Sequence, residues 1–334
     1  MKEVRWGILG CGKIAGKFAS DLGLIPEAVR YAAASRDAVK AEGFARQWGF
    51  AKAYGSYEAM LADPEVDAVY VATPHSHHHE HALLAIRHGK PVLVEKAFAL
   101  NLAQAQEMVD EARKHRVFLM EAFWTRLQPS FGYAMETLKS GILGPARLMR
   151  SEFCFYSPYK PESRLFNLDL GGGALLDIGI YPVFWALELM GEPDEIDVTA
   201  DLAPTGADQS IAMTFGYDGG KIAQLASSFT VCSDTQTEIW CEKGFIRIRR
   251  VDPHTVTVTV NRKDQSETTE TFSHGNGFGL YVEARHMMEC LDAGLIESPI
   301  LSHSFTLRLM NTLDRIRAAA GILYPADQTQ NRKS

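Results

Sequence analysis

The sequence predicts a two-domain α/β protein. The N-terminal domain is expected to be a Rossmann fold with a doubly wound parallel sheet, and the C-terminal domain a large, mainly antiparallel open sheet with helices on one face. The chain has 334 residues, more than a single hydrophobic core usually organises. Its first third alternates short apolar runs with helical segments, and the rest contains closely spaced β-branched runs. We therefore expect a dinucleotide-binding domain at residues 1–122 and a substrate domain at residues 123–334.

The strands of the first domain read as short, continuously apolar runs. They are "VRWGIL", "VRYAAAS", "DAVYVAT", "KPVLVEK" and "VFLME". Helical segments separate them, one starting at Lys13 and another running from Leu102 to about Lys114 with Asn101 as N-cap. Strands that are apolar throughout and followed by helices are typical of a parallel sheet covered on both faces.

In the second domain a glycine-rich helix, "GGGALLDIGIYPVFWALELMG", precedes alternating runs such as "SIAMTFGY", "KIAQLASSF" and "TVTVTVNR". Turn residues, for example Asp218-Gly219-Gly220, separate these runs and favour an antiparallel sheet. Two further helices are expected at about residues 279–293 and 304–320.

Composition and charge exclude several classes of protein. A net charge of −7 provides no basic surface for nucleic acid. The five cysteines are scattered and form no C-x-x-C, which argues against a disulfide framework or a zinc ribbon. No apolar stretch approaches the ~20 residues of a membrane span, and the N-terminus lacks a signal-peptide layout. A cytoplasmic location without nucleic-acid or membrane partners is expected.

The first strand ends in a glycine turn, "GILGCGKIA", that opens a helix. Gly10 permits the tight turn, Gly12 lets the backbone approach a pyrophosphate, and Ala15 allows close packing of helix and strand. The N–H groups at the helix start, including those of Lys13 and Ile14, would bind the phosphates.

The tip of the second strand should determine the choice of cofactor. Ser35 and Arg36 occupy it, and Asp37 follows. A hydroxyl and a guanidinium suit the 2′-phosphate of NADP. In the alternative, Arg36 is a solvated surface residue and Asp37 binds the ribose of NAD. We favour NADP over NAD.

Five histidines lie within residues 75–81, directly after the strand "DAVYVAT". Thr73, Pro74 and His75 therefore lie at the carboxyl end of a parallel strand, where open α/β sheets bind ligands. No carboxylate or cysteine is suitably placed to complete a metal site, so no metal is expected. Some of these histidines are expected to border the nicotinamide and the others to be solvated.

Two further segments carry groups suited to proton transfer. Glu95 and Lys96 end another parallel strand, and a partly desolvated lysine there could mediate proton transfer. A surface ion pair is the alternative. Asp177 and Tyr181 are four residues apart in the glycine-rich helix, where a phenol could exchange a substrate proton with help from a cation. Tyr181 could instead be a core tyrosine bonded to Asp177.

These motifs together resemble the Gfo/Idh/MocA oxidoreductases along nearly the whole chain. "GILGCGKIA", "VYVATPHSHHHEHALLAIRHGKPVLVEKA", "FLMEAFWTR", "GGGALLDIGIYPV" and "GNGFGLYVEARHMMECL" match the family pattern in order. The segments "EAFWTR" and "LLDIGIYP" are most similar to the branch of dimeric dihydrodiol dehydrogenases and NADP-dependent D-xylose 1-dehydrogenases.

The resemblance implies roles for particular residues. Lys96 and Tyr181 would act together in acid–base catalysis, and Asp177 would orient the substrate. His78 would border the cofactor, and Trp124 the substrate pocket. Phe153 and Phe155 are also expected to line that pocket, with core packing as the alternative. Family members use no metal and often dimerise through the open face of the C-terminal sheet.

The family's E-K-P motif here reads Glu95-Lys96-Ala97, so the backbone around Lys96 lacks the constraint of a proline. The expected activity is an NADP-dependent oxidation of a sugar, such as the aldose D-xylose, or of a trans-dihydrodiol. A keto-sugar reductase on the same scaffold and a non-catalytic sensor of NAD(P) are the alternatives.

Overall fold

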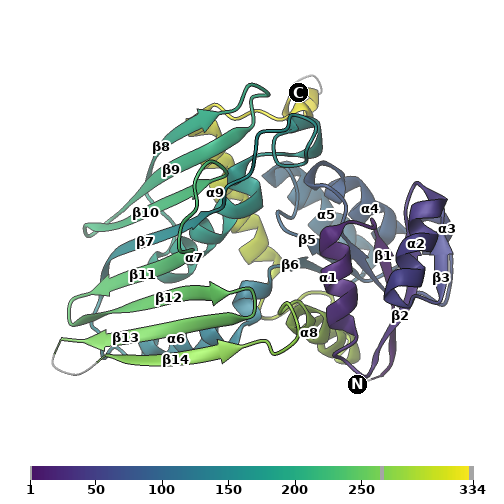
Figure 1. Ribbon diagram of the computed structural model, residues 1–334, viewed down its shortest axis with the longest axis horizontal. Coiled ribbons are helices and arrows are strands. Elements are labelled where there is room, and N and C mark those ends of the chain that lie inside the picture. Colours follow the sequence, from purple (N-terminus) through teal and green to yellow (C-terminus); the bar gives the residue numbers. More distant parts are fainter. Residues whose placement is uncertain (1, 264–266, 331–334) are drawn as a thin grey trace. The chain divides into compact units, whose positions relative to one another are not determined.

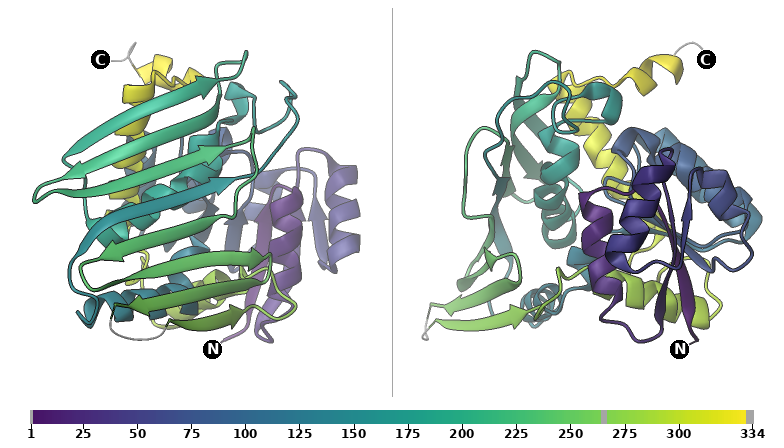
Figure 2. Two further views of the ribbon diagram at one scale, coloured as in Figure 1. Left: turned by 60° about the vertical axis from the view of Figure 1, so that its left-hand side comes forward. Right: turned by 45° about the vertical axis from the view of Figure 1, so that its right-hand side comes forward.

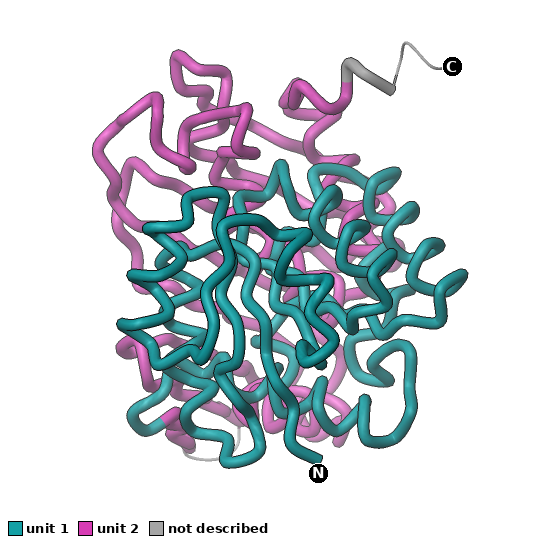
Figure 3. Tube along the Cα trace, turned by 90° about the vertical axis from the view of Figure 1, so that its right-hand side faces the viewer, with its two compact units in different colours: residues 1–127, 275–307 teal, residues 128–274, 308–334 magenta. Residues whose placement is uncertain are grey.

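In the computed structural model the chain divides into two compact units (Figure 3). Residues 2–263 and 267–330 are described, with side chains through residue 327. Unit 1 contains residues 1–127 and 275–307, and unit 2 contains residues 128–274 and 308–334. The sequence-based division at residue 122 differs in two respects, because the first part of unit 1 extends to residue 127 and a late segment of the chain returns to unit 1.

Unit 1 is built on a parallel sheet of six strands in the order β3-β2-β1-β4-β5-β6 (Figure 1). Its strands are β1 (Val4–Leu9), β2 (Ala28–Ala34), β3 (Lys52–Tyr54), β4 (Ala68–Val71), β5 (Val92–Glu95) and β6 (Leu119–Ala122). Its helices are α1 (Lys13–Leu22), α2 (Ala38–Trp48), α3 (Tyr57–Leu61), α4 (His78–Arg87), α5 (Leu102–His115) and α8 (Tyr281–Asp292), with 3-10 turns at His75–His77 and Trp124–Leu127. This is the strand order of a dinucleotide-binding fold, with its switch point between β1 and β4.

The predicted pattern of unit 1 is confirmed at the level of single elements. Strands β4, β5 and β6 are buried at every position, as continuous apolar runs require. The N-cap of α5 is Asn101, whose side chain accepts a hydrogen bond from the Gln104 backbone N–H.

A buried carboxylate is one of the groups that join residues 275–307 to the rest of unit 1. Asp21, in the last turn of α1, accepts hydrogen bonds from the backbone N–H groups of Phe278, Leu280 and Tyr281. These donors start α8, so Asp21 satisfies a helix N-terminus more than 250 residues away in the chain.

Unit 2 contains an eight-stranded sheet in the order β14-β13-β12-β11-β7-β10-β9-β8. The strands are β7 (Ala146–Cys154), β8 (Glu195–Leu202), β9 (Asp208–Tyr217), β10 (Lys221–Ser228), β11 (Gln236–Cys241), β12 (Gly244–Asp252), β13 (Thr255–Arg262) and β14 (Thr268–Ser273). Only the pairing of β7 with β10 is parallel among the described strand pairs of this sheet; the other pairings are antiparallel.

Helices α6 (Pro129–Lys139) and α7 (Ile180–Met190) pack on one face of this sheet (Figure 2). Side chains alternate accordingly: in β9, Met213 and Phe215 are buried, and Thr214 between them is exposed. Helix α9 (His303–Ala320) starts in unit 1 and ends in unit 2, and α10 (Pro325–Gln330) follows it.

One helical region corrects the expectation that no stretch is long and apolar enough to cross a membrane. Residues Leu168–Met190 meet that criterion by length and composition, with a mean hydropathy of 1.4. However, 89% of the most apolar part is buried inside the fold, as in the core helix of a globular domain.

Candidate cofactor and substrate sites

The glycine turn after β1 has the geometry that a pyrophosphate requires. Gly10 adopts φ +96°, and a Cβ there would press on the Ala72 carbonyl and the Thr73 methyl group at about 3 Å. Gly12 has nothing within 4 Å of a Cβ position, and no side chain caps the N-terminus of α1. The N–H groups of Lys13 and Ile14 at this helix start therefore suit phosphate oxygens, and the turn fits a dinucleotide.

At the tip of β2, Asp37 already has a structural role. Its carboxylate accepts a hydrogen bond from the Lys40 N–H, 3.2 Å away, and so caps α2. The Ser35 hydroxyl in turn accepts from the Asp37 N–H. Arg36 and Lys40 are exposed beside this cap. Because Asp37 already caps α2, it is less suited to bind the ribose hydroxyl of NAD. The cations Arg36 and Lys40 beside it favour the 2′-phosphate of NADP.

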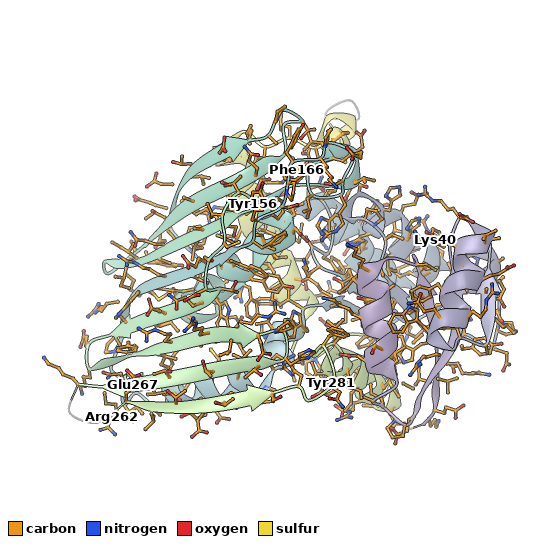
Figure 4. All side chains as sticks on the ribbon, in the orientation of Figure 1. Lys40, Tyr156, Phe166, Arg262, Glu267 and Tyr281 are labelled. Atoms are coloured by element: carbon orange, nitrogen blue, oxygen red, sulfur yellow. The ribbon has the colours of Figure 1, made fainter. Side chains whose placement is uncertain are left out.

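Lys40 is a candidate cofactor residue that the sequence analysis missed (Figure 4). Its charge is close enough to the glycine turn to oppose the effect of burial, which raises the pKa of the Cys11 thiol to about 11. The sequence feature that could have identified Lys40 is its position four residues after Arg36, in the first turn of α2.

The histidine run begins in a 3-10 turn and continues into α4, at the carboxyl end of β4 as predicted. His78 is completely buried, and its ring nitrogens lie 2.8 Å from the carbonyl oxygens of Ala97 and Thr73. Burial lowers the pKa of His78 to about 3, whereas the two carbonyl contacts raise it, because a neutral ring can donate to only one of the two oxygens. The expectation that His78 itself borders the nicotinamide is corrected: the side chain has no exposed surface and instead ties two loops together.

The other histidines make local contacts. The rings of His77 and His81 stack with centroids 5.5 Å apart, and His81 contacts the Thr73 hydroxyl at 3.0 Å. His75 is nearly buried and packs edge-on against His78. Within the described residues, no group of three or more His, Cys, Asp or Glu side chains is arranged to hold a metal ion.

Glu95 and Lys96 follow β5 at the same sheet edge. Glu95 is 7% exposed and accepts a hydrogen bond from the Tyr70 hydroxyl. The Tyr70 ring stacks on Phe18 of α1 at 3.8 Å between centroids. Glu95 is therefore fixed by the core, in contrast to a surface ion pair, and its chain neighbour Lys96 is only partly buried.

In unit 2, Asp177 lies in a π-helical turn, Leu175–Gly179, that leads into α7. Such turns are rare and are often found at functional sites. The Asp177 carboxylate, with only 9% of its side chain exposed, accepts a hydrogen bond of 3.0 Å from Arg164. Arg164 is a second candidate that sequence reasoning missed, because it comes from a loop whose course the sequence did not predict.

Tyr181, in the first turn of α7, contacts Phe153 of β7 with ring centroids 5.6 Å apart. Phe153 also packs against Phe155, which continues the aromatic row toward Phe229. Phe153 and Phe155 are both half-buried, packed against a buried cluster around Phe166. Phe153 thus lies beside Tyr181 within unit 2, and Phe155 extends this aromatic row.

The candidate residues divide between the units. Unit 1 carries the cofactor residues together with Lys96 and Trp124, and the half-buried Trp124 lies in the 3-10 turn after β6. Unit 2 carries Asp177, Tyr181 and Phe153.

Comparison with known proteins gives one family for both parts of the chain. Residues 4–123 match the oxidoreductase family with an NAD-binding Rossmann fold, GFO/IDH/MocA, and residues 131–247 match the GFO/IDH/MocA C-terminal domain. The trans-1,2-dihydrobenzene-1,2-diol dehydrogenase of Xenopus laevis is 37% identical over 96% of this chain and 99% of its own length. The human enzyme of that name is 34% identical over 97% and 99%.

Solved structures extend the comparison to the fold. KijD10, a 3-ketoreductase from Actinomadura kijaniata in complex with NADP and TDP-benzene, is 26% identical with a TM-score of 0.83, covering 96% of this chain and 98% of that one. The aldose-aldose oxidoreductase from Caulobacter crescentus has the same fold, with a TM-score of 0.86 at 23% identity and the same coverage.

Proposed function

This chain belongs to the Gfo/Idh/MocA family of NAD(P)-dependent oxidoreductases, and on that premise we propose that it is an NADP-dependent dehydrogenase of a sugar or a trans-dihydrodiol. The observation that carries the proposal is the similarity to trans-1,2-dihydrobenzene-1,2-diol dehydrogenases along nearly the full length of both chains. Fold alone would not carry it, because one fold serves many activities.

The chain's own residues would divide the chemistry as follows. Bound NADP⁺ supplies a hydride acceptor at C4 of its nicotinamide. Tyr181 takes the hydroxyl proton as the substrate C–H bond breaks, and Lys96 stabilises the phenolate or passes the proton on. Asp177, held by Arg164, orients the substrate hydroxyls. One hydride and one proton leave the substrate, which becomes a carbonyl compound.

The preference for NADP would come from Arg36 and Lys40. Arg36 follows the tip of β2, Lys40 lies in the first turn of α2, and both are exposed, whereas the carboxylate of Asp37 already caps α2. Replacing both cations, Arg36→Ala with Lys40→Ala, should weaken NADP binding about 100-fold or more and leave NAD binding nearly unchanged. Fluorescence titration with each cofactor measures both constants. Equal losses for the two cofactors would contradict the assignment.

Within unit 2, the substrate would lie against Phe153. An aromatic face beside Tyr181 suits the apolar side of a sugar ring or the ring of a cyclic diol.

The test of the activity is a panel of initial rates. Aldopentoses including D-xylose, aldohexoses and trans-dihydrodiols would be offered with NADP⁺ and with NAD⁺, alongside Lys96→Met and Tyr181→Phe. We expect NADP⁺ reduction with at least one substrate and a loss of 100-fold or more in each variant. Activity retained in Lys96→Met would refute the role of the lysine.

Reduction of a keto sugar is the second candidate, favoured by the similarity to the 3-ketoreductase KijD10. It would appear as NADPH oxidation by keto sugars with no turnover in the oxidative panel. Tight cofactor binding without turnover in either direction would instead favour a sensor.

We also propose a homodimer formed through the face of the eight-stranded sheet that α6 and α7 leave uncovered. A shallow cavity of about 700 Å³ lies on this face, lined by residues that include Arg150, Thr214 and Gln224. Thr214→Arg in the middle of the face should convert the dimer to monomers in sedimentation equilibrium.

A cytoplasmic location is consistent with five cysteines that are all free thiols.

A further inference from the structure

The backbone that follows Lys96 is held by buried side chains. The Ala97 carbonyl oxygen lies 2.8 Å from the His78 ring, and the Phe98 N–H donates to Glu121 Oε1 over 3.2 Å. The Leu100 N–H donates to Gln104. Ala97 and Phe98 have almost no exposed surface, so these bonds are protected from water. They supply a constraint that the family's proline would otherwise give by chain stiffness.

Glu121 is the only one of these partners that is a carboxyl group. It lies in β6, paired in register with Val94 of β5, and is 1% exposed. Its second oxygen, Oε2, accepts a hydrogen bond of 3.0 Å from the Thr306 hydroxyl of α9. Both oxygens are therefore bonded. A protonated Glu121 could still donate to Thr306 after rotation of that hydroxyl, because a hydroxyl can donate or accept.

Charged side chains close to Glu121 affect the pKa of its carboxyl group. Burial raises the pKa of Glu121 to about 7, although the hydrogen bonds from Thr306 and the Phe98 N–H lower it. The negative charge of Glu95 contributes to the increase, and the positive charge of Lys96 opposes it. Its charge therefore changes within the neutral pH range while its hydrogen bonds persist.

The elements packed around Glu121 bring these charged or titratable groups: Glu95 and Lys96 after β5, His78 on α4, His303 at the start of α9, Arg126 over the Phe305 ring, and Glu283 on α8 facing Glu95. Burial lowers the pKa of both histidines, and burial raises that of Glu283. Burial thus favours the neutral form of all three. Of the two cations in this set, Lys96 is the one whose positive charge lowers the pKa of Glu121.

We propose that Glu121 is a positioning residue for Lys96, fixing the backbone after the lysine by its bond to Phe98 and favouring the ammonium form by its charge. The inference rests on the proposed function, in which Lys96 takes part in proton transfer. Two effects follow and can be separated, since one depends on the reach of the side chain and the other on its charge.

Two variants separate them. Glu121→Gln keeps an acceptor for the Phe98 N–H but removes the charge. We expect kcat near the wild-type value, with the acidic limb of the kcat/KM profile for NADP⁺-dependent oxidation moved to lower pH by about one unit. Glu121→Asp keeps the charge but is one methylene too short for Phe98. It should lower kcat about 10-fold or more and leave the limb where it is.

Glu107→Gln, an exposed carboxylate on α5 in the same unit, is the matched control and should change neither quantity. Thermal unfolding at pH 4.5, where Glu121 is protonated in the folded protein, and the Kd for NADPH, measured on each full-length variant, should stay close to wild type for Glu121→Gln. If Glu121 had only a structural role, Glu121→Gln would lower the thermal stability at that pH and leave the pH dependence of kcat/KM unchanged.

The outcomes distinguish this inference from the function on which it rests. If Lys96→Met is inactive and the Glu121→Gln profile superimposes on wild type, Glu121 does not act on Lys96 and the inference is wrong, while the proposed function stands. If Lys96→Met is fully active, the lysine has no role in proton transfer and the inference falls with that role, while the activity itself stands. A shifted profile in Glu121→Gln together with an unshifted, slower Glu121→Asp supports the inference.

Discussion

Two buried carboxyl groups hold the backbone next to the proposed catalytic residues, one in each unit. Glu121 accepts from the Phe98 N–H, two residues after Lys96, and Asp208 accepts from the Leu175 N–H, two residues before Asp177. Both are essentially unexposed, and burial raises the pKa of each to about 7. The two units thus use the same device, a carboxyl oxygen on a backbone donor, at the start of a functional segment.

Their surroundings differ. Both oxygens of Glu121 are bonded and a lysine is nearby, whereas Asp208 Oδ1 has no hydrogen-bond partner among the described residues. Asp208 instead borders the glycine-rich turn, where the buried Tyr324 donates to the Gly172 carbonyl. The comparison teaches that two similarly buried carboxyl groups can serve different purposes. Glu121 acts on the charge of Lys96, and Asp208 shapes the backbone that leads to Asp177.

The largest effect should come from filling the space beside Asp208. Gly173 has φ +138°, and a Cβ there would collide with Asp208 Oδ1 and approach the Tyr324 hydroxyl. Gly173→Ala should destabilise unit 2 by about 3 kcal/mol or more and abolish activity. Urea unfolding followed by tryptophan fluorescence measures the loss. A variant with wild-type stability would show that the turn is not tightly packed.

The two carboxyl groups should also make stability depend on pH. The pKa of each is higher in the folded protein than in the unfolded chain. Their contribution is therefore complete below pH 4 and is lost as pH rises toward 7. Asp208→Asn and Glu121→Gln remove this loss.

Relative to wild type, each variant should gain stability between pH 4.5 and pH 8, by on the order of 3 kcal/mol if the whole shift is expressed. Urea midpoints at the two pH values test it. A constant difference between variant and wild type would mean that the group does not titrate in that range.

A smaller effect is expected at the C-terminal segment. Tyr324 donates to the Gly172 carbonyl over 3.0 Å, and its own N–H donates to Asp327, which pairs with Arg317. Tyr324→Phe removes one buried hydrogen bond and should cost about 1 kcal/mol. The same variant should raise KM more than it lowers kcat, since the turn before Asp177 loosens. Steady-state kinetics and thermal unfolding on one preparation check both statements.

The smallest effect on stability is expected in the glycine turn of unit 1. Gly12 has φ −95° and open space at its Cβ position, in contrast to Gly173. Gly12→Ala should leave the free energy of unfolding within about 0.5 kcal/mol of wild type. Its methyl group would project toward a bound pyrophosphate, so NADPH affinity should fall about 10-fold or more. Unchanged affinity would place the phosphates elsewhere.

Local patterns predicted much of unit 1. The continuous apolar runs, the glycine turn and Asn101 as N-cap depend on residues close in sequence, and the structure has them where expected.

The groups that hold the segments in place could not be found in this way. Glu121 is bonded to Thr306 across 185 positions, and Tyr324 to Gly172 across 152. No local pattern marks a buried carboxyl group as a partner of one distant N–H. The π-helical turn at Asp177 was likewise unforeseen, because helical spacing alone does not distinguish it from an α-helix.

The central claim is that Lys96 and Tyr181 act together on one substrate with NADP. A double-mutant cycle tests it most directly, with kcat/KM for NADP⁺ reduction measured in wild type, Lys96→Met, Tyr181→Phe and the double variant on the best substrate of the panel. Residues that act as a unit give non-additive losses, so the double variant should be about as slow as the slower single variant. Losses that multiply would show that the two side chains act independently, and would contradict the shared proton transfer proposed for them.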